Sequence, residues 1–411
     1  MMHFFNLFLG LALPALAQLH TSSRWILDSN NQRVKLRCVN WAGHMEVNIP
    51  EGLHHQSIDT ISSWIASNGF NCVRLTYSID MALNPSVKVA DSFVAAAGAA
   101  GVNESAMTTL YHQALAKNPF LADATRLDVF ASVIDTLHSK GVSTILDNHV
   151  SHASWCCNLT DGNGWWDTAQ GYNDWNSRYF NTTLWLDGLQ AMATFARSHA
   201  GVVGMSIRNE LRAFPLLQDL NNHDDWYEYV VQGAETVHAA NPDVLVIIGG
   251  VSSATDLSYI ADRPLDVSAW AGKHVWEFHA YSFTVTYPNP TGSCEVASAL
   301  YGHFIGYLLT QNETYTAPVL LSEFGVGMTG GPANNWGLSD GDHAYLQCLV
   351  QYMESNDAEW AVWAVQGSYY VRDSIVDYDE DYGLLTHDWS EWRNPAFPGM
   401  LGKMWNVTQG P

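Results

Sequence analysis

The chain has 411 residues, of which 47% are hydrophobic and 14% charged, so it can bury a sizeable core and general disorder is excluded. Its 18 basic and 41 acidic residues give a formal net charge of -23, which excludes a surface suited to nucleic acid or to an anionic membrane. The 17 Trp and 18 Tyr favour a carbohydrate ligand without deciding it, because sugar rings stack on flat aromatic faces.

The first 17 residues are typical of a secretory signal peptide, because an apolar run is followed by Pro14 and the small-x-small site Ala15-Leu16-Ala17. This run is too short to span a bilayer and nothing later reaches about 18 unbroken apolar residues, so we expect no membrane segment. Five N-x-Ser/Thr sequons fit the secretory route. They begin at Asn103, Asn158, Asn181, Asn312 and Asn406. The sequence therefore predicts a secreted, extracellular protein, which we expect to be a monomer with one folded domain over residues 18–411.

The cysteines are expected to pair in part in an oxidising compartment, although the sequence does not choose the connectivity. Adjacent Cys156 and Cys157 are hard to join without strain, so we expect a longer link from their loop to Cys294. Cys38 and Cys72 fall in apolar, strand-like runs and are candidates for buried thiols. The chain has no CxxC or HExxH motif, so no zinc site or other metal is expected.

Short apolar and β-branched runs alternate with helix-like stretches along the chain. The runs cover residues 34–39, 72–75, 143–147, 202–208, 244–248, 274–279, 319–323 and 359–365. Between them, apolar residues recur at helical spacing, as in 58–69 and 129–141, and each of these two stretches ends in a glycine suited to a helix C-terminus. The alternation predicts parallel strands joined by crossover helices.

Eight such units in one chain predict an α/β fold, a single (β/α)₈ TIM barrel with long βα loops. A barrel of this kind needs about 250 residues. The excess goes to loops, and the largest candidate insertions are 81–125 and 282–301. A doubly wound open sheet is the alternative, but no G-x-G-x-x-G motif follows the first run, so neither a dinucleotide site nor another cofactor is expected.

Functional side chains in a TIM barrel lie where the strands end. The polar and aromatic residues at these positions are Arg74, His149, Asn209, Glu210, His279, Tyr281, Glu323 and Trp363. Glu210 and Glu323 are the two carboxylates that stand out, and such a pair is the minimum machinery for hydrolysis of a glycosidic bond. Asn209 can bind a sugar hydroxyl, while Arg74 and Tyr281 can donate hydrogen bonds to Glu323.

Each candidate also has a purely structural interpretation. Arg74 can be a buried cation paired with a core carboxylate, and His149 and His279 can be satisfied core histidines. Four tryptophans are candidates for sugar subsites but can equally be packing residues, namely Trp41, Trp155, Trp165 and Trp166. The acidic stretch 373–381 alternates like a calcium loop, but Tyr382 stands where an EF-hand needs glycine, so we interpret it as a solvated turn.

An ordered set of short motifs carries a family resemblance, namely NCVRL, DNHV, IRNE, FHAY, LSEFG and AVWAV. With these motifs the mature chain resembles glycoside hydrolase family 5, the cellulase family of retaining (β/α)₈ glycosidases. The loop after His149, VSHASWCCNLTDGNGWW, is similar to a cellulase-like branch of plants and fungi. The chain departs from the usual pattern around His149, which is preceded by Asn148 and followed by Val150, where many members carry His-Asn or similar.

The resemblance implies that Glu210 is the acid/base and Glu323 the nucleophile of a double displacement. It also implies that Trp363 is the sugar platform and that Arg74, His149, Asn209, His279 and Tyr281 are supporting residues. The leading hypothesis is a hydrolase of a cell-wall β-glycan such as β-1,4-glucan. The alternatives are an exo-acting β-glycosidase or transglycosylase on oligosaccharides or glycoconjugates, whose loops wall the cleft into a pocket, and a non-catalytic carbohydrate-binding barrel.

Overall fold

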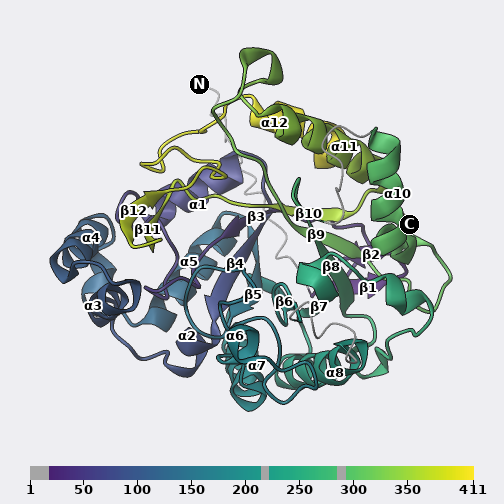
Figure 1. Ribbon diagram of the computed structural model, residues 1–411, viewed down its shortest axis with the longest axis horizontal. Coiled ribbons are helices and arrows are strands. Elements are labelled where there is room, and N and C mark those ends of the chain that lie inside the picture. The colour runs from purple at the N-terminus through teal and green to yellow at the C-terminus, as the bar shows by residue number, and fades with distance from the viewer. Residues whose placement is uncertain (1–17, 214–221, 285–292) are drawn as a thin grey trace, which may run out of the picture.

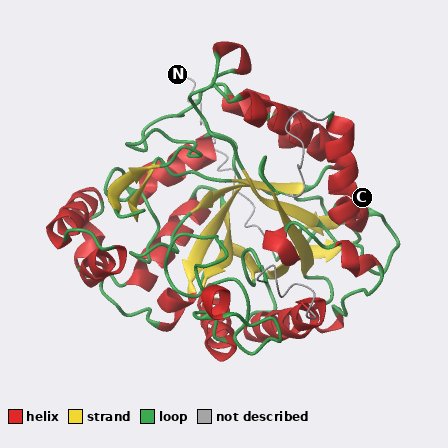
Figure 2. Ribbon diagram, in the orientation of Figure 1, coloured by secondary structure: helices red, strands yellow, loops and turns green. Residues whose placement is uncertain are grey.

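The computed structural model describes residues 18–213, 222–284 and 293–411 and contains a closed barrel of eight parallel strands at its centre (Figures 1 and 2). The predicted signal peptide lies outside the described residues. The barrel strands follow the order of the chain around the ring, and β10 closes it against β3. They are β3 (Arg37–Trp41), β4 (Cys72–Ser78), β5 (Ser143–Val150), β6 (Val202–Ser206), β7 (Leu245–Gly249), β8 (His274–Ala280), β9 (Val319–Phe324) and β10 (Glu359–Val362).

The predicted (β/α)₈ barrel is confirmed, and each of the eight predicted runs contains most of one barrel strand. The largest difference is at the first run, where β3 begins at Arg37 rather than at residue 34. Here Val34 donates its backbone N–H to Ile26, so it continues a separate N-terminal hairpin. That hairpin consists of β1 (His20–Ser22) and β2 (Trp25–Leu27).

Helices surround the barrel in the connections between its strands (Figure 2). The helices of the described chain are α1 (Ile58–Ser67), α2 (Ile79–Leu83), α3 (Val89–Ala100), α4 (Glu104–Lys117), α5 (Arg126–Ser139), α6 (Asp174–Ser177), α7 (Thr182–Ala196), α8 (Asn222–Ala240), α9 (Val251–Ala254), α10 (Cys294–Phe304), α11 (Asp340–Asn356) and α12 (Phe397–Met400). None of them is both long and apolar enough to cross a membrane.

The two helices predicted from apolar spacing are α1 and α5. Each begins at a polar cap, since Ser57 accepts a hydrogen bond from the third residue of α1 and Thr125 forms a capping box with Asp128 in α5. Beyond their C-terminal ends, Gly69 and Gly141 have φ angles of 86° and 76°, the left-handed conformation that glycine adopts without strain. Local sequence chemistry therefore sets where both helices begin and end.

The insertion predicted at 81–125 forms a pair of helices, α3 and α4, at the periphery of the molecule (Figure 1). Of the two, α3 packs on β11 (Ser368–Arg372), which pairs with β12 (Ile375–Asp379) in a hairpin after the last barrel strand. The second predicted insertion, 282–301, lies partly outside the described residues, and α10 begins within it.

Inward-facing side chains change from apolar to polar along the barrel strands. On β5, Ile145 belongs to the apolar cluster inside the barrel, and Asp147 follows two residues later; on β8, Val275 and Glu277 repeat the pattern. Because alternate strand residues share a face, both carboxylates lie inside the barrel, where neither has exposed area. The apolar start of each strand thus forms a packed base, and the polar end forms the floor of a site.

The cysteines pair differently from the prediction. Cys38 and Cys72 are not thiols but form a disulfide, because they are direct partners in the register of β3 and β4. Cys294 pairs with Cys348, joining α10 to α11, so the expected link from the 156–157 loop to Cys294 is wrong. The remaining disulfide joins the neighbours Cys156 and Cys157.

Candidate functional site

Glu210 and Glu323 lie across one cavity at the mouth of the barrel, although 113 positions separate them in sequence (323 - 210). His279 lies between the two, with its Nδ1 2.9 Å from Glu210 Oε1 and 3.7 Å from Glu323 Oε2. One oxygen of each carboxylate and a His279 ring nitrogen all lie within 4.8 Å of one another. The structure thus brings the two predicted carboxylates together above the ends of β6 and β9.

Glu323, on β9, is held by two donors, Arg74 on β4 and Tyr281 just beyond the end of β8. Arg74 Nη1 donates to Oε1 at 2.8 Å, and the Tyr281 hydroxyl donates to Oε2 at 3.0 Å. Burial raises the pKa of Glu323, whereas the nearby His279 and Arg74 act to lower it. With both oxygens engaged from below, the carboxylate has a fixed orientation toward the cavity.

Arg74 connects this carboxylate to the rest of the floor. The side chain has no exposed area, and its Nη2 donates to Asp147 Oδ1 and to Asn209 Oδ1, each at 2.8 Å. Burial alone would lower the pKa of Arg74, but the surrounding carboxylates Asp147, Glu277 and Glu323 raise it above its ordinary value. The guanidinium is therefore a permanent cation that orients the site. The predicted pairing of Arg74 with a core carboxylate and its predicted contact with Glu323 both occur.

Glu210 occupies a different environment. Its backbone has a φ of 45°, an uncommon conformation for a residue with a side chain, and its carboxyl is 16% exposed toward the cavity. Burial raises the pKa of Glu210 to about 7, against the opposing effects of Arg212 and Arg74, and the Ser253 hydroxyl contributes a hydrogen bond. Near neutral pH this carboxyl can therefore both give and accept a proton.

His149 and His279 are both buried beside the carboxylates. His149 Nδ1 lies 2.6 Å from Asp147 Oδ2, and its ring stacks on that of Trp363 with centroids 5.4 Å apart. Burial lowers the pKa of both histidines, so their imidazoles are neutral near pH 7. Each positions a neighbouring carboxylate through a hydrogen bond, His149 that of Asp147 and His279 that of Glu210.

The cavity has a volume of about 500 Å³, within the range of small-ligand sites. Its lining contains six of the predicted strand-end residues, namely His149, Asn209, Glu210, Tyr281, Glu323 and Trp363. Arg74 and His279 lie beneath it and hold the carboxylates. Tyr281 stacks on Phe283, a ring that is 72% exposed, so aromatic surface extends outward from the carboxylates. Such faces suit the apolar sides of sugar rings.

Trp41 and Trp166 do not line the cavity, which corrects the prediction that they contact a ligand. Neither has any exposed area. Trp41 follows the inward-facing Asn40 on β3, so it points outward, packs on Trp389 and donates to the backbone of Glu51. Trp166 packs among aromatic rings outside the barrel. These are Trp165, Phe180, Trp185 and Tyr229.

Several lining residues were missed by sequence reasoning. Arg372, the last residue of β11, lies 3.4 Å over the ring of Trp155, one of the tryptophans that the sequence did offer as a candidate, and both line the cavity. Ser252 and Ser253 also line it, in a left-handed turn after β7 with φ angles of 55° and 59°. Nothing in the sequence signals that turn. Asp147 is different, because its position at the end of a predicted strand identifies it as part of the floor of the site.

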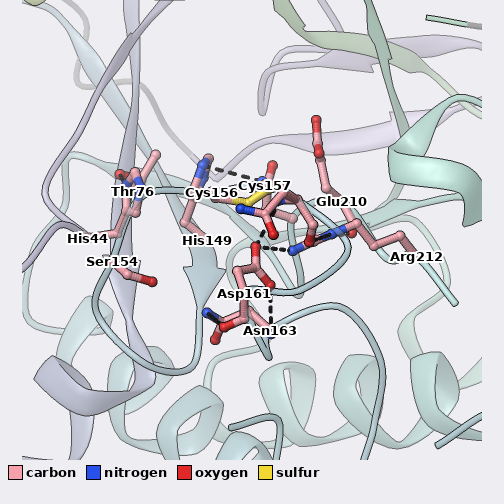
Figure 3. The surroundings of a disulfide bond; sticks show 12 residues. His44, Thr76, His149, Ser154, Cys156, Cys157, Asp161, Asn163, Glu210 and Arg212 are labelled. Carbon is pink, nitrogen blue, oxygen red and sulfur yellow. Dashed lines mark hydrogen bonds and ion pairs between the residues drawn. A yellow bond between two sulfur atoms is a disulfide. The ribbon is translucent and has the colours of Figure 1, made fainter. Parts of the chain in front are cut away.

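The Cys156–Cys157 disulfide also belongs to this lining. Figure 3 shows it between His149 and Glu210, with Arg212 and Asp161 beside the same loop. Its sulfur atoms lie 3.6 Å and 3.5 Å from the Asn209 amide nitrogen. The pair therefore contacts the candidate site directly.

The predicted solvated turn at 373–381 has a more defined structure. Asp377 accepts hydrogen bonds from His54, His55 and His387 at 2.8, 3.0 and 3.0 Å, and its side chain is 28% exposed. The three histidines come from two other loops, so the contact ties the β11–β12 hairpin to the barrel mouth. The interpretation as a freely solvated turn is therefore wrong for Asp377.

Comparisons with known proteins agree with this architecture. The family model Cellulase (glycosyl hydrolase family 5) matches residues 27–368. A glycosyl hydrolase 5 family protein from Chamaecyparis obtusa is 37% identical over 401 residues, covering 95% of this chain and 66% of the relative. An endoglucanase from Paenibacillus polymyxa is 23% identical over 406 residues, covering 94% of this chain and 86% of the relative.

Two solved structures share the fold at low identity. An endocellulase from Pyrococcus horikoshii, in a complex with cellotetraose, has a TM-score of 0.71 at 16% identity and covers 95% of this chain and 99% of that chain. The catalytic domain of the major endoglucanase from Xanthomonas campestris has a TM-score of 0.68 at 19% identity, covering 94% and 99%.

Proposed function

The chain belongs to glycosyl hydrolase family 5, the cellulase family, whose enzymes hydrolyse β-glycosidic bonds, and we propose that it is a secreted, retaining hydrolase of β-1,4-glucan. Glu323 is the nucleophile and Glu210 the acid/base. The leader-like residues 1–17 and the paired cysteines support secretion. The chain spans 66% of the Chamaecyparis obtusa relative, so its substrate is inferred from the site and not from that protein.

The spacing of the carboxylates carries the proposal. Oxygens of Glu210 and Glu323 lie within 4.8 Å of each other, which fits the separation of about 5 to 5.5 Å typical of retaining enzymes. An inverting enzyme needs about 6.5 to 9.5 Å, because a water molecule must fit between the second carboxylate and the sugar. The short spacing favours direct attack by a carboxylate.

The two environments distinguish the roles. Glu323 accepts hydrogen bonds from Arg74 and Tyr281, which orient it and stabilise its ionised form as a nucleophile. Glu210, with a pKa of about 7, keeps its proton over the acidic range and can pass it to a leaving oxygen. Opposite protonation states in one cavity are what a double displacement requires.

The reaction proceeds in two steps. In the first, a Glu323 oxygen attacks the anomeric carbon while Glu210 gives its proton to the departing glycosidic oxygen. In the second, Glu210 takes a proton from water, and the resulting hydroxide displaces Glu323 and leaves the anomeric configuration unchanged. Arg74 and His279 keep the carboxylates aligned throughout.

The choice of β-1,4-glucan rests on two observations. Aromatic faces from Trp363, Trp155 and Phe283 flank the carboxylates, as a chain of stacked sugars requires. In addition, the relatives from Paenibacillus polymyxa and Xanthomonas campestris are endoglucanases. The α3–α4 insertion contributes no residue to the cavity lining, so it does not wall off a pocket for exo action.

A product screen with a stereochemical readout tests the proposal. Purified enzyme is incubated with β-1,4-glucan, mixed-linkage glucan, mannan, xylan and aryl β-glycosides, and the products are followed by proton NMR. We expect the fastest release from β-1,4-glucan, with the β-anomer appearing first. An α-anomer would rule out the mechanism, and release of single sugars only from chain ends would identify an exo-glycosidase.

A further inference from the structure

The disulfide between Cys156 and Cys157 is a fixed part of the cavity wall. It lies on the loop after β5, close to Glu210 (Figure 3). Both cysteines line the cavity together with Glu210 and Glu323. A disulfide carries no N–H or O–H group, and its sulfurs are weak hydrogen-bond acceptors. This stretch of wall is thus an apolar surface next to the reacting groups.

The Asn209 side chain lies between Arg74 and the disulfide. Arg74 has only donors, so Asn209 must turn Oδ1 toward it and Nδ2 away from it, toward the two sulfurs. His149 Nε2 is a further neighbour of Nδ2 at 3.3 Å. A sugar hydroxyl oxygen accepts a hydrogen bond better than sulfur does. A bound sugar would therefore place a hydroxyl against Nδ2, beside the disulfide.

The geometry identifies which hydroxyl this is, on the basis of the function proposed above. One guanidinium, that of Arg74, binds Glu323 through Nη1 and Asn209 through Nη2, both at 2.8 Å. The carbon attacked by Glu323 and the hydroxyl bound by Asn209 are therefore close together. The nearest hydroxyl to the anomeric carbon is the 2-hydroxyl, whose hydrogen bonds strengthen in the transition state of such reactions.

The loop that carries the disulfide is anchored by residues outside the cavity lining. Arg212 forms an ion pair with Asp161, with side chains only 4% and 5% exposed, and its Nε donates to the backbone of Asn158 at 3.1 Å. Arg208 Nη1 donates to Ser151 Oγ at 3.1 Å at the start of the same loop. A wall anchored at both ends does not yield easily to a larger ligand.

We propose that the Cys156–Cys157 disulfide is the specificity-determining wall at carbon 2 of the reacting sugar. It leaves room for a 2-hydroxyl bound to Asn209 and excludes a larger substituent, such as an acetamido group, at that carbon. The selectivity arises from the shape and rigidity of the sulfur pair, and the disulfide takes no part in bond cleavage.

The test compares two aryl β-disaccharides that share a leaving group, a cellobioside and its analogue with a 2-acetamido group on the reacting sugar. The ratio of their kcat/KM values is measured for the wild type, for Cys156→Ala/Cys157→Ala and for the control Cys294→Ala/Cys348→Ala. The control also loses one disulfide, but one whose cysteines are not part of the cavity lining. Contacts of this size in a pocket change selectivity by about 10- to 200-fold.

The wild type is expected to favour the cellobioside strongly, and the Cys156→Ala/Cys157→Ala variant to reduce this preference by about 10-fold or more. The control keeps the wild-type ratio. An unchanged ratio in the first variant would overturn the proposal. A wild type that hydrolyses neither compound, nor any β-glycan, would instead refute the proposed function itself.

A second measurement applies if the double variant does not fold. The wild type is reduced with a water-soluble phosphine, which takes oxygen from water to become its oxide while the disulfide gains two electrons and two protons. Alkylation and mass spectrometry then identify which pairs open. We expect Cys156–Cys157 among them, because Cys157 is partly exposed, whereas Cys38 and Cys72 have no exposed area. Cys294 is also partly exposed, so the same reduction of Cys294→Ala/Cys348→Ala removes the contribution of that pair. After reduction the two sulfurs are no longer bonded and must move apart to van der Waals distance, so the wall loses its fixed shape. The preference for the cellobioside should therefore fall on reduction. Opening of the pair with no change in preference would contradict the proposal.

Discussion

Replacing Tyr281 by phenylalanine tests how Glu323 is held. The variant keeps the ring, which stacks on Phe283, and removes only the hydroxyl that lies 3.0 Å from Glu323 Oε2. A hydrogen bond to a charged group contributes about 1.5 to 3 kcal/mol. At about 1.4 kcal/mol per tenfold change, kcat/KM should fall by about 10- to 150-fold.

The same substitution should alter the pH profile. Burial already raises the pKa of Glu323, and loss of the Tyr281 donor removes a contact that favours the ionised form. The pKa of Glu323 should therefore rise, and the acidic limb of the kcat/KM profile should move to higher pH. The basic limb, which reports Glu210, should move much less.

The assay is hydrolysis of an aryl β-cellobioside from pH 3 to pH 9. Tyr307→Phe is the matched control, because it also removes a hydroxyl that donates one hydrogen bond, to the backbone of Leu257 at 2.6 Å, outside the cavity lining. If Tyr281→Phe retained wild-type kcat/KM and an unmoved acidic limb, the role given to Glu323 would be wrong.

Three further substitutions test other parts of the account. Glu210→Gln should abolish the basic limb of the pH–rate profile near pH 7, because the group with a pKa of about 7 is gone. It should also slow the hydrolysis of substrates with poor leaving groups by on the order of 100-fold or more. An intact basic limb would contradict this. Burial acts to raise the pKa of Asp377, but hydrogen bonds from the nearby histidines outweigh it and lower this pKa well below its ordinary value. The Asp377 carboxylate therefore stabilises the fold above about pH 4, and this stabilisation is lost as the pH falls through the lowered pKa. Asp377→Asn should therefore lower the free energy of unfolding by about 1 to 3 kcal/mol at pH 7 and by less at pH 3, as urea titrations would measure. Trp166→Phe should lower the melting temperature and leave KM unchanged, because the ring lies in the core; a higher KM with unchanged stability would restore it as a ligand contact.

The barrel could be predicted because its strands are short apolar runs and its helices carry their own caps. Once eight parallel strands close into a ring, their C-terminal ends must meet at one mouth, which brings Glu210 and Glu323 together. The prediction thus needed the order of the elements and not their exact ends. That is why β3 could begin three residues later than expected without affecting the site.

The failed predictions concern properties set by tertiary structure. Trp41 was placed in the site because tryptophan suits sugars, but the phase of β3 directs it outward. The pairing of Cys38 with Cys72 depends on strand register, and that of Cys294 with Cys348 on how two helices pack. Neither register nor helix packing can be read from residue types alone.

Trapping of the covalent intermediate tests the central claim most directly. The enzyme is incubated with an activated 2-deoxy-2-fluoro aryl β-cellobioside, digested, and analysed by peptide mass spectrometry. The account predicts one added sugar unit on the peptide that contains Glu323, and none in Glu323→Gln. A label on Glu210 or on any other residue, or rapid turnover with inverted products and no labelled peptide, would contradict it.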